Sequence, residues 1–356
     1  MTVLSIVGAR PQFVKAFPVS RELRASCEEV LVHTGQHYDD ELSAVFFREL
    51  DIPEPDYHLG IGSASHAQQT AEMMLALEPI VEREQPDQIL VYGDTNSTLA
   101  GALVAAKTDA TLAHVEAGLR SHNWSMPEEV NRVLTDHCAD LLLAPTVAAC
   151  ENLAAEGITE GVHVTGDVMY DAVERVRERA RETSTIHTDL EVEEGEYVLA
   201  TVHRAGNTDD PDRLAAILDG LGSIDRPVVF PIHPRTANAI EAAGLEATAA
   251  ELRVVDPVGY VDFVRLLDGA ERVATDSGGV QKEAFFLDTR CITLREETEW
   301  IETVECGWNV LVGADEAAIE RELRRDDPLP RKPSLYGDGT AASAVVDVLV
   351  TATIEN

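Results

Sequence analysis

Residues 88–118 read QILVYGDTNSTLAGALVAAKTDATLAHVEAG, and this stretch decides the fold class. It contains two continuous apolar runs, 88–94 and 111–118, separated by a segment long enough for one helix. Continuous apolar runs of this length are typical of strands buried on both faces, as in parallel sheets. The stretch therefore predicts a βαβ unit.

The same alternation continues along all 356 residues. Six apolar runs fall in each half of the chain: 3–8, 29–35, 88–94, 111–118, 141–146 and 163–167, then 197–203, 227–233, 252–257, 272–278, 290–296 and 309–314. Because the chain is also too long for one ordinary core, we predict an α/β protein with two doubly wound, Rossmann-like domains. We place the first domain at 1–167 and the second at 168–339. A final helix, about 340–356, can pack on either domain.

The chain is strongly acidic. It has 28 Lys and Arg against 64 Asp and Glu, a formal net charge of −36, and only four of the cations are lysines. Such a surface repels phosphate backbones and anionic lipid, so nucleic acid and membranes are disfavoured as partners. It suits a salty cytoplasm, since 1 M salt screens charge over about 3 Å. We therefore expect a halophilic protein.

Cofactor and metal signatures are missing from the sequence. The five cysteines are scattered without a C-x-x-C pair or a zinc-type histidine spacing, which indicates thiols in a reducing compartment. There is no G-x-G-x-x-G, Walker or H-E-x-x-H motif, so we infer no nicotinamide, no cofactor and no metal. The N-terminus has no secretion signal and no run approaches 18 apolar residues, so we expect a cytoplasmic protein.

Charged and imidazole side chains follow six of the predicted strands. In open α/β sheets this carboxyl edge is where ligands bind. Turn chemistry can explain any one of these residues, but six such strand ends favour a ligand site. The residues are Arg10 with Lys15 one turn later, Asp94, Glu116, His203 with Arg204, His233 with Arg235, and Asp276.

Arg10 and Lys15 lie at a predicted helix start, a position that favours anions. A phosphate contact is one interpretation of these two cations, and an ion pair with a neighbouring acid is the other. The paired His203-Arg204 and His233–Arg235 sites favour neutralisation of a ligand's charge.

The run DSGGVQKE, 276–283, predicts a second anion site. The backbone N–H groups of Gly278 and Gly279 can cradle a diphosphate, and the Ser277 hydroxyl adds a donor. Glu283 is then placed to accept from ribose hydroxyls. The alternative is an Asp or Ser N-cap with a capping-box glutamate.

Three glutamates in HVEAGLRSHNWSMPEEVNR, 114–132, need separate interpretations. Glu116 ends an apolar strand, where burial raises a carboxyl pKa and nearby Arg120 lowers it, so it is the best acid/base candidate. Glu128 also fits a capping box that begins at Ser125, which leaves its role open. Glu129 is predicted to be an ordinary helix residue. Asp94, at the end of another strand, can face the same space as Glu116.

These residues lie in motifs that resemble those of the non-hydrolysing UDP-N-acetylglucosamine 2-epimerases. The motifs occur in family order over almost the whole chain: GARPQFVK, TGQH, GDTNSTLAGALVA, HVEAGLRS, MPEEVNR, HRAGNTD, PIHPRT, DSGGVQKEA, TEWIE and YGDG. The resemblance implies two Rossmann-like domains of the glycosyltransferase-B type, with the active site in the interdomain cleft and the last helix returning to the first domain. It also implies a homodimer without a nicotinamide or an essential metal.

The resemblance further implies inversion at C2 of UDP-N-acetylglucosamine (UDP-GlcNAc). The C2 proton is removed, UDP leaves to give 2-acetamidoglucal, and UDP adds back with a proton delivered to the other face, giving UDP-N-acetylmannosamine (UDP-ManNAc). By motif, the catalytic residues are Asp94, Glu116, Glu128 and His203. The residues expected to bind the UDP-sugar are Arg10, Lys15, Arg120, Arg204, His233, Arg235, Phe263 (at the uracil), Asp276, Ser277, Gly278, Gly279 and Glu283.

The chain departs from common family patterns at three places. The family motif HRRE reads HRAG here (203–206), and TERPE reads TEWIE (298–302). In members that UDP-GlcNAc activates, glutamines follow the motif TAQH, whereas here TGQH is followed by YDD (38–40). We therefore do not expect allosteric activation. Four alternatives stay open: a 2-epimerase of UDP-2,3-diacetamido-glucuronic acid, a hydrolysing enzyme that releases ManNAc and UDP, a glycosyltransferase of the same fold, and a UDP-sugar sensor that binds without turnover.

Overall fold

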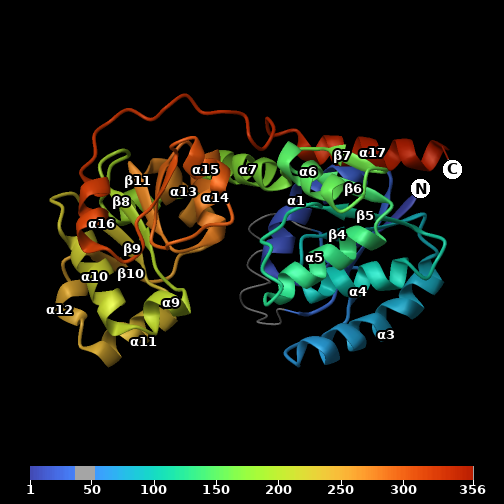
Figure 1. Ribbon diagram of the computed structural model, residues 1–356, viewed down its shortest axis with the longest axis horizontal. Helices are drawn as coiled ribbons and strands as arrows, with labels where there is room; N and C mark the ends of the chain where they lie inside the picture. The colour runs from blue at the N-terminus through green and yellow to red at the C-terminus, as the bar shows by residue number, and fades with distance from the viewer. Residues whose placement is uncertain (37–52, 356) are drawn as a thin grey trace. The chain divides into compact units, whose positions relative to one another are not determined.

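The computed structural model describes residues 1–36 and 53–355, and the chain forms two α/β units (Figure 1). The N-terminal unit comprises residues 1–172 and 334–356, and the C-terminal unit comprises residues 173–333. Each unit is built around one parallel sheet, which confirms the predicted pair of doubly wound, Rossmann-like domains.

The N-terminal sheet has seven strands in the order β3-β2-β1-β4-β5-β6-β7, and each of these pairings is parallel. The six apolar runs predicted in this half all form strands. The strands are β1 (Thr2–Val7), β2 (Glu28–His33), β3 (Tyr57–His58), β4 (Gln88–Tyr92), β5 (Thr111–Val115), β6 (Leu141–Ala144) and β7 (Val162–Val164). The sequence did not predict β3, because two residues make no apolar run.

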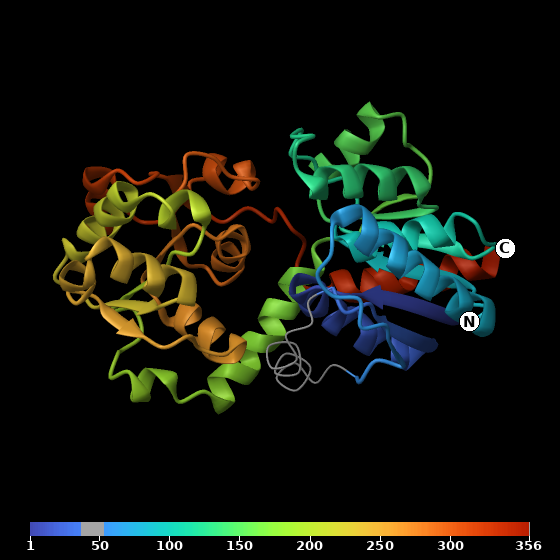
Figure 2. The same cartoon turned by 90° about the horizontal axis from the view of Figure 1, so that it is seen from below.

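Helices cover both faces of this sheet (Figure 2). On one face α1 packs against α17, and on the other α3, α4 and α5 pack in a row. The bounds are α1 (Arg10–Ser26), α3 (His66–Glu84), α4 (Asn96–Ala105), α5 (Pro127–Cys138), α6 (Val147–Ala155) and α17 (Ala341–Glu355), while α7 (Val168–Thr183) runs from the first unit into the second. Gln88 secures α17 by donating to the Leu349 carbonyl at 2.7 Å. Within the described residues, no helix combines the length and the apolar character that crossing a membrane requires.

The C-terminal sheet has six parallel strands in the order β10-β9-β8-β11-β12-β13. All six predicted runs form strands: β8 (Val198–Thr201), β9 (Val228–Pro231), β10 (Arg253–Val255), β11 (Arg272–Thr275), β12 (Arg290–Thr293) and β13 (Asn309–Leu311). The helices are α8 (Ile186–Asp189), α9 (Ala205–Thr208), α10 (Pro211–Gly222), α11 (Pro234–Ala243), α12 (Glu246–Ala249), α13 (Tyr260–Gly269), α14 (Gly278–Phe286), α15 (Ile301–Glu305) and α16 (Glu316–Leu323).

The strand order reverses once in each sheet, between β1 and β4 in the first and between β8 and β11 in the second. Loops diverge at such a point, so the carboxyl edge there opens a crevice for a ligand. The loops that begin at Gly8, Gly93, Val202 and Asp276 leave the sheets at these points. The topology therefore places Arg10, Asp94, His203, Arg204 and Asp276 just after the strands that flank the two points of reversal, while Glu116 and His233 follow the next strands outward.

Candidate active site

Glu116 follows β5 in a left-handed backbone conformation, with φ of 72°. This conformation costs a non-glycine residue about 1–2 kcal/mol, so the surrounding structure must hold it in place. Its carboxylate pairs with the Lys15 ammonium of α1, and only 8% of the Glu116 side chain and 13% of the Lys15 side chain are exposed. Of the two interpretations of Lys15, the structure shows the ion pair. The side chain of Arg10 lies outside the described part of the chain.

Asp94 follows β4 and pairs with Arg132 of α5, which also donates to Glu129 at 3.1 Å. Burial alone would lower the pKa of Arg132, but attraction by Asp94, Glu129 and Glu116 raises it. Arg132 is therefore a fixed positive charge among three carboxylates. The sequence analysis missed this residue, although Glu129 and Arg132 have the i, i+3 spacing of a helical ion pair.

Glu129 has a structural role, as predicted, but its position is not that of an ordinary helix residue. It is 1% exposed and accepts hydrogen bonds from the Ser121 N–H and hydroxyl, both at 2.9 Å, and from the His122 N–H at 2.8 Å. Burial raises the pKa of the Glu129 carboxyl, but these bonds and Arg132 lower it overall. Glu129 therefore ties residues 121–122 to α5 as a carboxylate.

Glu128 has the opposite environment. Its side chain is exposed on the first turn of α5. The capping alternative for Glu128 was wrong. The N-cap position of α5 is Met126 rather than Ser125, and the Ser125 hydroxyl donates to Asn123 at 2.6 Å. Glu128 is therefore an exposed carboxylate with no capping role, on the helix that also carries Arg132.

Arg120, which the sequence predicted to bind substrate, makes two ion pairs within the N-terminal unit. Its side chain is 2% exposed, and its guanidinium donates to Asp136 at 2.7 Å and to Glu156 at 2.6 and 2.8 Å. These contacts hold the loop after β5 to α5 and α6. The role of Arg120 is therefore to support the loop that carries Glu116.

In the C-terminal unit, the loop after β8 is organised by Asp276. This residue is fully buried, and its carboxylate accepts from the backbone N–H groups of His203 and Arg204 at 3.0 and 2.9 Å and from the Asn207 amide at 3.2 Å. We predicted Asp276 as a substrate contact. In the structure its carboxylate holds the loop that carries His203 and Arg204.

His203 and His233 end neighbouring strands, with ring centroids 5.7 Å apart. Burial lowers the pKa of His203, the Asp276 carboxylate 3.2 Å from its Nδ1 raises it, and His233, Arg204 and Arg235 lower it further. The net shift of the His203 pKa is downward, which favours the neutral imidazole. A neutral imidazole next to two arginines can exchange a proton near bound anionic groups.

The start of α14 has the features of an anion site. Ser277 is the N-cap, and a Cβ placed on Gly279 would have only the Ser277 hydroxyl within 4 Å, at 3.9 Å. A Cβ on Gly278 would lie 3.5 Å from the Arg204 guanidinium and 3.5 Å from the Glu299 carboxylate, and these two groups are 4.0 Å apart. The helix start therefore leaves space for a ligand beside its backbone N–H groups, with the Arg204–Glu299 pair next to it. Trp300 supports the turn by donating to the Gly278 carbonyl at 2.8 Å.

Glu283 lies one turn further along α14 and is 7% exposed. It accepts from the Tyr260 hydroxyl at 2.8 Å, so the capping-box alternative was wrong for this residue. Tyr260 begins α13, the helix that also carries half-buried Phe263. The sequence analysis missed Tyr260, which brings α13 against α14.

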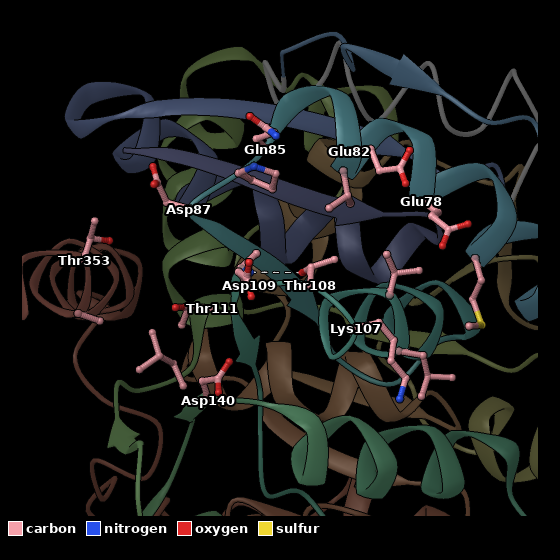
Figure 3. Close-up of a pocket in the computed structure, with 18 of the residues that line it drawn as sticks. Glu78, Glu82, Gln85, Asp87, Lys107, Thr108, Asp109, Thr111, Asp140 and Thr353 are labelled. Atoms are coloured by element: carbon pink, nitrogen blue, oxygen red, sulfur yellow. Dashed lines mark hydrogen bonds between the residues drawn. The ribbon is translucent and has the colours of Figure 1, made fainter. Parts of the chain in front are cut away.

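The N-terminal unit also has a hollow of about 1290 Å³ that is separate from the carboxyl edge of its sheet (Figure 3). Its lining includes Asp87, Thr111 and Leu141, so it lies at the amino ends of β4, β5 and β6, away from Asp94 and Glu116. Its acids, Glu78, Glu82, Asp87, Asp109 and Asp140, outnumber its one cation, Lys107. This hollow is unsuited to a diphosphate. The described residues also contain no cluster of His, Cys, Asp or Glu arranged to hold a metal ion.

Comparison with known proteins identifies similar chains. The model of the family described as UDP-N-acetylglucosamine 2-epimerase matches residues 21–350. A UDP-N-acetylglucosamine 2-epimerase homolog of Methanococcus maripaludis is 46% identical over 354 residues, covering 98% of this chain and 99% of the relative. The UDP-2,3-diacetamido-2,3-dideoxy-D-glucuronate 2-epimerase of Pseudomonas aeruginosa is 47% identical over 359 residues, with coverage of 98% and 99%.

A solved structure is similar over the full length. The crystal structure of the Methanocaldococcus jannaschii UDP-GlcNAc 2-epimerase, in complex with UDP-GlcNAc and UDP, has a TM-score of 0.86 and 39% sequence identity to this chain. It covers 99% of this chain and 100% of its own. The similarity therefore extends over both α/β units.

Proposed function

The chain belongs to the UDP-N-acetylglucosamine 2-epimerase family, and we propose that it interconverts UDP-GlcNAc and UDP-ManNAc without hydrolysis. It is an isomerase of the UDP-sugar 2-epimerase class. The observation that carries the proposal is the set of carboxylates at the carboxyl edge of the N-terminal sheet, in a chain similar to these epimerases along its whole length. Asp94 and Glu116 end adjacent strands there, and each is paired with a cation.

The proposed reaction needs a base, an acid and a site for the leaving diphosphate. A carboxylate takes the C2 proton, the C–H electrons form the C1=C2 bond, and the C1–O bond breaks to release UDP. UDP then adds back to C1 while an acid gives a proton to the other face of C2. We propose Asp94, Glu116 and Glu128 for the two proton transfers.

The C-terminal unit is proposed to bind UDP. The open backbone N–H groups of Gly278 and Gly279 and the guanidinium of Arg204 match a diphosphate that gains charge as it leaves. We propose that His203, whose pKa is lowered mainly by burial, donates to or accepts from this group without adding a permanent charge. Phe263 is proposed to contact the uracil, and Glu283 the ribose. Arg10, Lys15, His233, Arg235 and Ser277 complete the proposed set.

One observation supports a second candidate for the sugar. The Pseudomonas aeruginosa relative at 47% identity is named for UDP-2,3-diacetamido-2,3-dideoxy-D-glucuronate. Both nucleotide sugars should therefore be assayed in parallel. A higher kcat/KM for the glucuronate would assign this chain to the second sugar while leaving the reaction type unchanged.

The cellular setting is proposed from composition and family. We propose a cytoplasmic homodimer adapted to high salt, with a product that enters surface polysaccharide or glycan biosynthesis. The net charge of −36 supports the salt adaptation. Light scattering at high salt tests the dimer, since a mass near 38.7 kDa would contradict it.

The decisive experiment is incubation with UDP-GlcNAc in D2O, followed by NMR. The proposed route puts deuterium at C2 of both epimers and ends in a mixture of two UDP-sugars. Stoichiometric free UDP and ManNAc would instead indicate the hydrolysing alternative. Tight UDP binding with no deuterium at C2 would indicate a sensor of nucleotide sugars rather than an enzyme.

A further inference from the structure

His114 lies in β5, two residues before Glu116, and none of its surface is exposed. Its Nε2 is 2.7 Å from the carbonyl oxygen of Gly93, and its Nδ1 is 2.7 Å from Oδ1 of Asp136. Gly93 immediately precedes Asp94. One buried side chain of the strand that ends in Glu116 thus touches the peptide that leads into Asp94.

Both contacts require a proton on the imidazole. A carbonyl oxygen and an ionised carboxylate only accept hydrogen bonds. Asp136 is ionised, because its Oδ2 accepts from the Arg120 guanidinium at 2.7 Å and from the Gly118 N–H at 3.1 Å. His114 therefore donates from both ring nitrogens, to the Gly93 carbonyl and to Asp136.

β5 fixes the Gly93 peptide from two directions. The Gly93 N–H donates to the Val115 carbonyl at 3.0 Å, and its carbonyl accepts from His114. The residue takes φ of 62°, and a Cβ on it would lie 3.0 Å from the Lys15 ammonium and 3.4 Å from the Glu116 carboxylate. A rotation of this peptide would therefore move Asp94 relative to the Lys15–Glu116 pair.

Asp136 extends the connection to the other side of Glu116. It accepts from the Gly118 N–H at 3.1 Å and belongs to α5, the helix that carries Glu128 and Arg132. The His114–Asp136 pair thus joins the loop after β4, the loop after β5 and α5. A buried ion pair often stabilises a fold less than apolar packing of the same volume, so stability alone does not explain charges at this point.

We propose that the His114–Asp136 pair is a positioning device that holds Asp94 and Glu116 at the separation needed for proton transfer at C2. The role rests on the proposed epimerase function. His114 is a positioning residue and not a catalytic one, because it has no exposed surface with which to touch a substrate. The contact that matters for turnover is the one between Nε2 and the Gly93 carbonyl.

Two substitutions separate the two contacts. The amide nitrogen of glutamine lies near the position of Nε2 in histidine, so His114→Gln keeps a donor to Gly93 and loses the contact with Asp136. The amide nitrogen of asparagine lies near Nδ1, so His114→Asn does the reverse. Since misplacement by about 1 Å can cost about 100-fold, we expect kcat for C2 exchange to fall about 100-fold in His114→Asn and about 10-fold in His114→Gln, with KM unchanged.

Leu77→Ala is the matched control. Leu77 is fully buried in the same unit, but it lies on α3, which carries no proposed catalytic residue. This variant should lose thermal stability and keep kcat at temperatures where it is folded. Equal kcat values in the two His114 variants, or losses that only follow the folded fraction, would overturn the positioning role.

A spectroscopic measurement tests the pair without using turnover. With 15N-labelled histidine in the wild-type protein, the His114 ring, assigned through its bonds to its own backbone amide, should carry protons on both nitrogens. A bare ring nitrogen on His114 would overturn the proposal, even if both variants fail to fold. If the wild type exchanges no deuterium at C2, the epimerase function fails, whereas a failure confined to the comparison of His114 variants refutes the positioning role alone.

Discussion

Replacing Glu129 with glutamine removes the charge that joins the loop at 121–122 to Arg132. In Glu129→Gln the remaining side-chain oxygen can still accept from Ser121. The new NH2 group then faces the His122 N–H, and two donors cannot form a hydrogen bond with each other. Losing one hydrogen bond and leaving the part-buried His122 N–H unpaired costs about 1–3 kcal/mol, and the weaker bond to Arg132 adds to this cost. We expect the free energy of unfolding to fall by about 2–3 kcal/mol.

The effect should depend on pH in a defined direction. The pKa of the Glu129 carboxyl is lowered from its ordinary 4.5 in the folded protein, so its ionisation stabilises the fold above that value. This stabilisation is lost as pH falls through the folded-state pKa. The difference in stability between the wild type and Glu129→Gln should therefore be full at pH 7 and shrink below pH 4.5.

Glu129→Gln should also slow turnover, because Arg132 holds Asp94. Urea unfolding in concentrated KCl measures stability, and deuterium exchange at C2 measures turnover. Glu128→Gln is the matched control: exposed Glu128 should lose exchange while stability stays within about 0.5 kcal/mol of the wild type. A Glu129→Gln protein as stable and as active as the wild type would refute the proposed role of Glu129.

Three further predictions concern other parts of the molecule. Glu116→Gln should abolish deuterium exchange while calorimetry shows nearly unchanged UDP binding, and unchanged turnover would contradict its assignment to proton transfer. Asp276→Asn should loosen the loop of His203 and Arg204 and weaken UDP binding about 10-fold, or about 1.4 kcal/mol; an unchanged Kd would show that the loop does not depend on this carboxylate. Because of the net charge of −36, the melting temperature should rise steeply with KCl, and full stability in dilute buffer would refute the halophilic interpretation.

The fold was predictable because parallel strands buried on both faces have continuous apolar sequences. Each of the twelve predicted runs became a strand, and β3 was missed because it is only Tyr57–His58. The carboxyl edge was predictable for the same reason, since the residue after each run must lie there. Asp94, Glu116, His203 and Gly278 were found in this way, and Glu128 only through the resemblance.

The partners of these residues were not predictable, because they come from segments distant in sequence. Nothing in MPEEVNR shows that Glu129 faces inward to Ser121, since this depends on the turn at which α5 begins. Likewise, the sequence around Asp276 predicts a ligand contact but does not show that the loop after β8 folds around its carboxylate. Sequence position predicts which residues lie at the carboxyl edge of each sheet, and the three-dimensional contacts show which of them also bind neighbouring loops and helices.

One NMR measurement tests the proposed chemistry without any variant. The purified protein is incubated with UDP-GlcNAc in D2O at high KCl, and C2 of each sugar is followed over time. Elimination and re-addition predicts deuterium at C2 in both UDP-GlcNAc and UDP-ManNAc, with the total of UDP-sugars conserved. UDP-ManNAc formed with the original C2 hydrogen would contradict the route, and no UDP-ManNAc at all would contradict the proposed activity on this sugar.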